Sequence, residues 1–319
     1  MTYFRNFALA GMALFLFHGR ARAVEPFPAE CKLGLAATVP INLENGHVIV
    51  PVTVNGYPRA FAIDTGAFTS AVSKSVVAEQ GIKTYGIHKD VELEDSGHKK
   101  AELYATLEEF VIGNQKAKSA RMAVMEPGSG DGLIGPEYLR NYDLDFDFAA
   151  GTLNLFRHHP CSGRAVYWTD DYFVVPMDVT DQGHIRIDVS LDGKPVRAMI
   201  DTGAAVTVIG KAVAQSEFNV DIDKVNVEGG GVFTLSGMNG GEQGAVPHRF
   251  TSLQIGGISI KNPVLAISTK ERGVQFDYTR LVLGMPELHN LHLYIAYQER
   301  KLYFSRAAAN ASDPARVQH

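Results

Sequence analysis

Asp64-Thr65-Gly66-Ala67 recurs unchanged as Asp201-Thr202-Gly203-Ala204, and each copy follows an apolar run that ends in isoleucine. A single tetrapeptide of this kind predicts no more than a turn after a strand. Two copies at matched positions indicate an internal repeat, in which each half supplies one aspartate. The repeat therefore predicts two carboxyl groups that a pseudo-two-fold arrangement could bring face to face.

The similarity of the halves extends well beyond the tetrapeptide. A shift of 137 residues aligns residues 47–67 with residues 184–204 without a gap, and in both segments apolar residues alternate with mostly polar ones, as in half-buried strands. Asn55-Gly56 falls on Asp192-Gly193, and both dipeptides favour the type I′ turn of a β-hairpin. Each half is expected to contain a hairpin whose return strand delivers the aspartate.

Later matches complete the two halves. Leu133-Ile134-Gly135 matches Val282-Leu283-Gly284, with a short helix expected after each glycine, and residues 152–155 match residues 301–304 as a closing strand. Longer helices are expected only near residues 72–80 and 209–216. The predicted fold class is all-β and bilobal, with two homologous β-barrel-like lobes, pseudo-two-fold symmetry and a few short helices.

The predicted organisation divides the chain into a signal peptide, an N-terminal segment, two lobes, a linker and a flexible tail. The signal peptide is expected at residues 1–23 and the N-terminal segment at 24–40. The lobes are expected at 41–157 and 172–306, the linker between them at 158–171, and the tail at 307–319. Residues 24–40 could be a propeptide, a strand that closes a sheet between the lobes, or a loose arm.

The N-terminus is typical of a secretory signal. Residues 7–17 are apolar, Arg5 precedes them, and the segment ends in Ala21-Arg22-Ala23, a small-x-small cleavage pattern. This run is too short to span a bilayer as a helix. We expect an exported protein, periplasmic or secreted, without stable membrane insertion after cleavage; the alternative is an uncleaved amphipathic anchor.

The net charge bears on the class of binding partner, and the two cysteines bear on disulfide formation. The formal net charge is −5, and loss of three arginines with the signal makes it −5 − 3 = −8, which argues against nucleic acid. The only cysteines, Cys31 and Cys161, could form a disulfide after export, worth about 4 kcal/mol by loop-closure entropy, or remain two unpaired thiols.

The duplicated aspartates suit the hydrolysis of amides. This reaction needs a base to deprotonate water and an acid to protonate the substrate, and two carboxyls that share one proton can do both. A glycine two residues after each aspartate is expected to permit close backbone approach and a positive φ. The threonine between them can hydrogen-bond across the pair.

Over residues 41–306 the chain resembles aspartic proteases of the retroviral (retropepsin) type, in a bilobal single-chain form typical of bacterial exported proteins. The resemblance rests on the two Asp-Thr-Gly-Ala tetrapeptides and the two apolar-apolar-glycine motifs. It implies that Asp64 and Asp201 are the catalytic dyad and that Gly135 and Gly284 pack behind it in a ψ-shaped arrangement. The implied supports of the dyad are Thr65, Gly66, Ala67, Thr202, Gly203 and Ala204. Such a mechanism uses no cofactor and no metal.

The alanines of the two motifs bear on pH. Pepsin-like enzymes usually carry a serine or threonine at the positions of Ala67 and Ala204, whereas retroviral enzymes carry alanine. A hydroxyl that donates to an ionised carboxyl lowers its pKa. Its absence predicts a dyad that titrates higher than that of pepsin and works in mildly acidic solution.

Two loops are candidates for the flaps that close over substrate in this family. The first is residues 88–101, which turns at Ser96-Gly97 and is dense in charge, and the second is the glycine-rich stretch 228–244 around Met238. Neither has the apolar tip of retroviral flaps, so both could be plain surface loops.

Other polar residues are given structural interpretations. His158-His159-Pro160-Cys161 reads as a solvated loop rather than a metal site, Asp145 and Asp147 as ordinary strand-flanking acids, and Trp168 as a packing residue.

The leading hypothesis is an aspartic endopeptidase that binds an extended polypeptide between its lobes. One alternative is a catalytically silent peptide-binding protein with the same fold, and another is a site shared between two chains. The gap-free duplication favours a monomer over an obligate dimer, because each half supplies the other with a matched partner.

Overall fold

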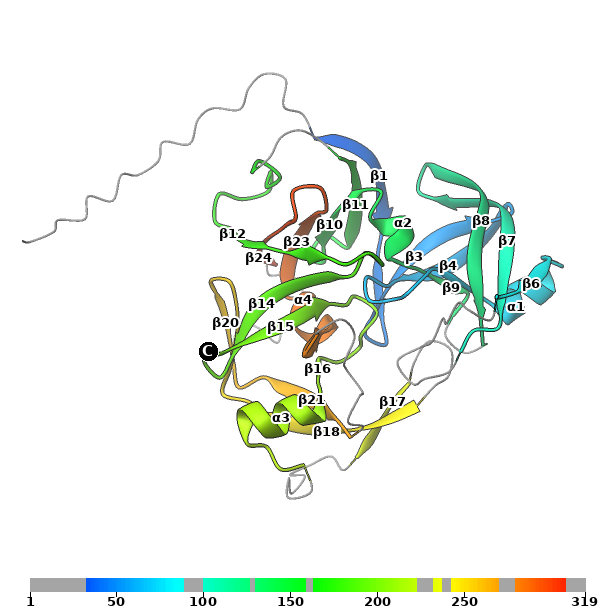
Figure 1. Ribbon diagram of the computed structural model, residues 1–319. Helices are drawn as coiled ribbons and strands as arrows, with labels where there is room; N and C mark the ends of the chain where they lie inside the picture. Colours follow the sequence, from blue (N-terminus) through cyan, green and yellow to red (C-terminus); the bar gives the residue numbers. More distant parts are fainter. Residues whose placement is uncertain are drawn as a thin grey trace, which may run out of the picture. The chain divides into compact units, whose positions relative to one another are not determined.

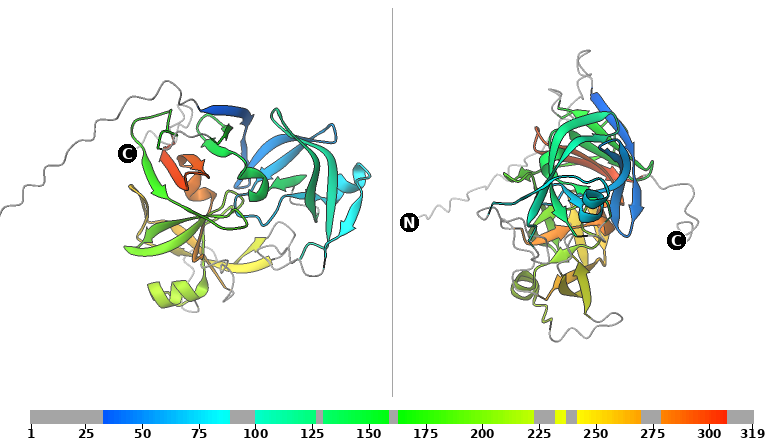
Figure 2. Two further views of the ribbon diagram at one scale, coloured as in Figure 1. Left: turned by 45° about the horizontal axis from the view of Figure 1, so that its top comes forward. Right: turned by 90° about the vertical axis from the view of Figure 1, so that its right-hand side faces the viewer.

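The computed structural model describes residues 33–88, 100–126, 130–158, 163–222, 232–236, 242–269 and 279–307. Within these ranges the chain is mostly β-strand, with a few short helices, and the predicted bilobal all-β fold is confirmed. In Figures 1 and 2 the strands between residues 42 and 134 and those between residues 178 and 283 form separate groups.

The first lobe is built on a sheet that, in the described residues, has eight strands in the order β2-β3-β4-β9-β5-β8-β7-β6. An additional pairing between β3 and β7 closes part of it into a ring. The strands are β2 (Asn42–Glu44), β3 (His47–Val54), β4 (Tyr57–Ile63), β5 (Ala71–Ser73), β6 (Thr84–Gly86), β7 (Leu103–Ile112), β8 (Gln115–Met125) and β9 (Gly132–Ile134).

The second lobe repeats this plan. Its sheet has ten strands within the described part of the chain, in the order β17-β18-β21-β16-β22-β15-β14-β19-β20, with β13 paired to β14. The strands are β13 (Asp178–Val179), β14 (Ile185–Leu191), β15 (Lys194–Ile200), β16 (Val208–Ile209), β17 (Phe233–Ser236), β18 (Glu242–Arg249), β19 (Ser252–Ile255), β20 (Ile258–Lys261), β21 (Val264–Ser268) and β22 (Leu281–Leu283).

A third sheet draws strands from both halves. Over the described residues it has six strands in the order β1-β11-β10-β23-β24-β12, and the halves meet where β10 pairs with β23. The strands are β1 (Gly34–Pro40), β10 (Asp143–Asp147), β11 (Thr152–Arg157), β12 (Phe173–Pro176), β23 (Leu291–Ala296) and β24 (Lys301–Arg306). Of the three interpretations of residues 24–40, the structure supports the sheet-closing strand for Gly34–Pro40, while the domain boundaries stay predictions.

The helices are short and follow strands. They are α1 (Lys74–Glu79), α2 (Pro136–Leu139), α3 (Lys211–Phe218) and α4 (Met285–Leu288). Ser73 caps α1, because its Oγ accepts the Val76 N–H at 3.3 Å. The helices expected near residues 72–80 and 209–216 and after Gly135 and Gly284 are therefore confirmed, with ends shifted by at most two residues. No helix of the described ranges is long and apolar enough to span a membrane.

Alternating burial and turn chemistry shape the two hairpins. In β3 and β14 the residues that face the core alternate with more exposed ones, as the sequence pattern predicts. Asn55 and Gly56 have φ of 49° and 86°, and Asp192 and Gly193 have φ of 47° and 77°. Positive φ at both central residues defines the type I′ turn, so this prediction is confirmed.

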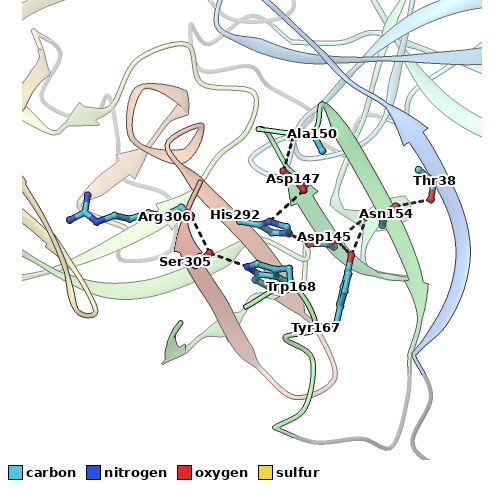
Figure 3. A network of polar contacts seen from close by, with 10 residues as sticks. All are labelled: Thr38, Asp145, Asp147, Ala150, Asn154, Tyr167, Trp168, His292, Ser305 and Arg306. Carbon is cyan, nitrogen blue, oxygen red and sulfur yellow. Dashed lines mark hydrogen bonds and ion pairs between the residues drawn. The ribbon is translucent and has the colours of Figure 1, made fainter. Parts of the chain in front are cut away.

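A buried polar network fastens the segment before β12 to the six-stranded sheet (Figure 3). Asp145 is 0% exposed and accepts hydrogen bonds from the Tyr167 hydroxyl, from Asn154 Nδ2 at 3.0 Å and from His292 Nε2 at 2.7 Å. The interpretation of Asp145 as an ordinary strand-flanking acid is therefore wrong. Trp168 does pack, since its ring stacks on His292 with centroids 4.0 Å apart.

His158, the described part of the tetrapeptide 158–161, is not a solvated residue. Its Nδ1 lies 3.1 Å from Asp143 Oδ1, and its Nε2 lies 3.1 Å from the Arg140 carbonyl oxygen. The side chain is 22% exposed. These contacts attach the end of β11 to the turn after α2.

Candidate active site

The two aspartates each follow the return strand of a hairpin. Asp64 comes directly after β4 and Asp201 directly after β15. Each of these strands lies parallel to a later strand of its own half, and the aspartate N–H donates to that strand, to the Ile134 carbonyl in the first half and to the Leu283 carbonyl in the second, both at 3.0 Å. Matched local sequences thus place both aspartates in matched local frames.

Reciprocal threonine bonds join the two loops. The Thr65 N–H donates to Thr202 Oγ1 at 3.2 Å, and the Thr202 N–H donates to Thr65 Oγ1 at 3.1 Å. Each hydroxyl then donates to the opposite half, from Thr65 to the Ile200 carbonyl at 2.8 Å and from Thr202 to the Ile63 carbonyl at 2.7 Å. Both threonines are 0% exposed, so these bonds have no competing water and hold the loops in fixed register.

The glycines of the motif allow the loops to approach closely. A Cβ on Gly66 would lie 2.3 Å from Asp201 Cγ, and a Cβ on Gly203 would lie 2.3 Å from Asp64 Cγ. The expected close approach is therefore confirmed. The expected positive φ is wrong, because neither glycine has a φ in the left-handed region. What these positions require is the absence of a side chain.

Gly66→Ala is expected to lower kcat/KM by about 100-fold or more, because the new methyl would displace the Asp201 carboxyl by about an ångström. Gly34→Ala is the matched control, since its Cβ would meet only Arg157 Cβ at an ordinary 3.6 Å. Steady-state kinetics and thermal unfolding of both variants check the prediction. A Gly66→Ala enzyme as active as Gly34→Ala would contradict it.

The carboxyl groups touch and differ in their surroundings. A hydrogen bond joins the two side chains. Burial, and after it the charge of Asp201, raise the pKa of Asp64 well above its usual value, against the N–H groups of Gly66 and Ala67. Burial also raises the pKa of Asp201, but the Gly203 N–H, the Asp64 side chain and the charges of His184 and His47 oppose it. The surroundings thus raise the pKa of both carboxyls, with more opposing interactions at Asp201, and the two titrate as one pair.

A second polar layer, which sequence reasoning missed, supports both loops from behind. The Gly135 N–H donates to Ser70 Oγ and the Gly284 N–H donates to Thr207 Oγ1, both at 2.9 Å. A helix glutamate completes each set: Glu137 Oε1 accepts the Ser70 N–H at 2.6 Å, and Glu287 accepts the Thr207 hydroxyl. A hydroxyl six residues after each aspartate and a glutamate just after each Gly-containing motif were the available signals.

The flap candidates are described only at their bases. In the first lobe β6 and β7 pair antiparallel on either side of the candidate, and in the second β17 and β18 pair antiparallel, with β17 and the start of β18 inside the candidate stretch. The predicted tip residues Ser96, Gly97 and Met238 lie outside the described residues. So do Cys31 and Cys161, and their pairing stays a prediction.

No cluster of histidine, cysteine, aspartate and glutamate side chains suited to a metal ion occurs within the described ranges. The two aspartates interact with one another, with backbone N–H groups of their loops and, for Asp201, with the charges of His184 and His47. This arrangement can hold one proton between two carboxyls and pass it in either direction.

Comparisons with known proteins match each half to an aspartyl-protease family. Residues 50–138 match a family described as aspartyl protease, and residues 187–290 match a family described as gag-polyprotein putative aspartyl protease. A solved retropepsin-like aspartic protease from Rickettsia conorii is 20% identical, with a TM-score of 0.31; the match covers 44% of this chain and 94% of that one. Among curated proteins, none matches.

Proposed function

Because both halves of this chain are retropepsin-like aspartyl-protease sequences, we propose that it is an endopeptidase in which Asp64 and Asp201 activate one water molecule against a peptide bond. The observation that carries the proposal is the contact of the two buried carboxyls, which the reciprocal Thr65 and Thr202 bonds hold together. Like-charged groups this close ionise one at a time, which supplies the acid and the base that amide hydrolysis needs.

The roles of the two carboxyls follow from their surroundings. Asp201, with the smaller rise in pKa, is the base that takes a proton from water. Asp64 is the acid that donates to the substrate carbonyl oxygen as the water oxygen bonds to the carbonyl carbon. Asp201 then donates its proton to the leaving nitrogen while Asp64 takes a proton back from a hydroxyl of the tetrahedral intermediate, which breaks the carbon–nitrogen bond and restores the starting pair.

The substrate is a polypeptide bound in extended form. The edge strands β6 and β17, which belong to the antiparallel pairs at the two flap candidates, offer backbone groups to which a substrate strand can pair. The arginine-flanked apolar N-terminus motivates the further proposal that the protein acts after export, in a periplasm or outside the cell. Both aspartates come from one chain, which suits a monomer.

The pH dependence follows from the two carboxyls. If the carboxyl pair is active only while it holds a single proton, kcat/KM plotted against pH is bell-shaped, with its maximum between the two macroscopic pKa values of the pair. Burial raises the pKa of both aspartates, and Ala67 and Ala204 provide no side-chain hydroxyl to lower them. We expect optimal kcat/KM at roughly pH 4–6, and a maximum near pH 2 would contradict the assigned environments.

Assay of purified residues 24–319 against casein and a peptide library from pH 3 to 7 tests the function. Internal cleavage that a hydroxyl-containing peptide analogue of the transition state inhibits is the expected result. Saturable peptide binding without cleavage at any pH would instead establish the silent binding protein. Size-exclusion chromatography of the active fraction would decide between a monomer and a site shared by two chains.

A further inference from the structure

One histidine stands at the base of the hairpin in each half. His47 begins β3, His184 immediately precedes β14, and the 137-residue shift makes the two positions equivalent. The chemistry assigned to the aspartates uses neither ring. Both histidines nevertheless lie beside an active-site loop of the other half.

His184 holds the first-half loop directly. Its ring is almost buried, with 4% of the residue exposed, and Nε2 lies 2.9 Å from the Ala67 carbonyl oxygen. Because a carbonyl oxygen only accepts, Nε2 carries hydrogen and donates. The edge of the ring also meets Phe68, with centroids 5.5 Å apart and an interplanar angle of 72°. Thr180 fixes the histidine backbone through two bonds, at 3.0 and 3.1 Å.

The segment around His47 makes the equivalent approach to the second-half loop. Gly46, with φ of +80°, packs so closely that a Cβ on it would lie 2.8 Å from Ala205 Cβ. The neighbouring His47 Nδ1 is buried and has no hydrogen-bond partner in the described part of the chain. Burying a nitrogen without a partner costs free energy, so this position is held by the packing of the segment around it.

We propose that His47 and His184 are positioning residues of the aspartate pair: each histidine segment braces the active-site loop of the opposite half and so sets the surroundings in which the pair ionises. This inference rests on the proposed function. The electrostatics of Asp201 agree with it: burial raises the pKa of this carboxyl, and the charges of His184 and His47 lower it. An opposite charge nearby favours the ionised carboxyl.

Other charged groups lie around the two rings. Glu44 faces His47 across the β2–β3 pairing, and Arg140, which donates to the Asp181 carbonyl at 2.9 Å, reaches the Gly183 segment before His184. The groups to consider in any pH dependence are Asp64, Asp201, Glu44, Arg140, Asp181 and Arg186. Glu44, Arg140 and Asp181 are exposed, so solvent screens them more than it screens the aspartates.

Glutamine variants separate charge from hydrogen bonding. His184→Gln keeps an N–H donor for the Ala67 carbonyl but removes the charge, so the acid limb of the kcat/KM profile should move up by roughly 0.5–1 pH unit. His184→Leu removes both and should also lower kcat at the optimum. His47→Gln should move the same limb in the same direction, and the double variant should move it further. His248→Gln, whose ring faces Asp192 at the distant hairpin turn, is the matched control and should leave the limb in place.

A measurement without substrate separates this inference from the proposed function. Carbon-13 NMR titration of the aspartate carboxyls in residues 24–319 follows the pair directly in wild type, His184→Gln, His47→Gln and His248→Gln. The lower macroscopic pKa of the pair should rise in the first two variants and not in the third. If the protein cleaves no peptide, the function fails while the titration still decides this point. Superimposable titrations of wild type and both histidine variants would overturn the inference.

Discussion

Asp64→Asn and Asp201→Asn are each expected to lower kcat/KM by at least about 10³-fold. Asparagine keeps the size and shape of aspartate but can neither take a proton from water nor donate one as an acid. Since the two carboxyls share one proton and act as a unit, the double variant should be no worse than the worse single variant. Rates of cleavage of one peptide at the pH optimum measure all three effects.

These variants should fold. The Gly203 N–H donates to Asp201 Oδ1 at 2.8 Å and the Gly66 N–H donates to Asp64 Oδ1 at 3.0 Å, and an asparagine carbonyl can accept the same bonds. The matched control is Asp188→Asn on β14, a side chain that is 71% exposed and pairs only with Arg197 at the surface, where we expect less than about a two-fold change. Activity within ten-fold of wild type in either dyad variant would remove the shared-proton mechanism.

The duplication is what made the fold and the aspartate pair predictable. The same motif ends a hairpin in each half, and two matched halves can be related by a pseudo-two-fold axis. Asp64 and Asp201 were therefore expected to lie face to face although 137 residues separate them. The turns were predictable for a local reason, because Asn55-Gly56 and Asp192-Gly193 carry the positive φ that type I′ turns require. Both predictions rest on signals that either recur or act within a few residues.

The polar residues behind the aspartate loops were not predicted, for a different reason. Ser70 and Glu137 are 67 residues apart and have no local pattern that marks them as partners. Their counterparts Thr207 and Glu287 differ in residue type or spacing, so the hydroxyl after each aspartate and the glutamate after each motif gave only a weak signal before the sheets were known. For the motif glycines, the close backbone approach was predicted correctly and the positive φ was not. The two can differ because lack of space for a side chain and a left-handed backbone torsion are separate reasons for a glycine.

The burial of Asp145 was not predicted because the second half has no acidic residue at the equivalent position. In the β10–β23 pairing Asp145 lies opposite Tyr294, and that sheet combines residues that differ between the halves. Reasoning from symmetry says little about an asymmetric contact between lobes. A charged residue inside an otherwise apolar strand pattern was the one available signal that it is buried with partners.

Asp145→Ala is expected to lower the free energy of unfolding by roughly 3–5 kcal/mol. The substitution removes the common acceptor of the Tyr167 hydroxyl, Asn154 Nδ2 and His292 Nε2 (Figure 3). It leaves Nε2 of the buried His292 without this acceptor, whereas Asn154 and Tyr167 keep partial access to solvent. Each stranded donor costs about 1–3 kcal/mol, and the Trp168 ring that stacks on His292 limits repair by water. Chemical denaturation with a common m-value measures the loss.

Asp147→Ala is the matched control, because it removes the same group two residues along the same strand. Its side chain is 27% exposed, lies 3.7 Å from His292 Nδ1 and accepts the Ala150 N–H at 2.8 Å. Water can replace these contacts, so we expect a loss of about 1 kcal/mol or less. Equal losses in the two variants would mean that Asp145 contributes only what any strand carboxyl contributes. A large difference would identify the network that fastens the segment before β12 to the sheet both lobes share.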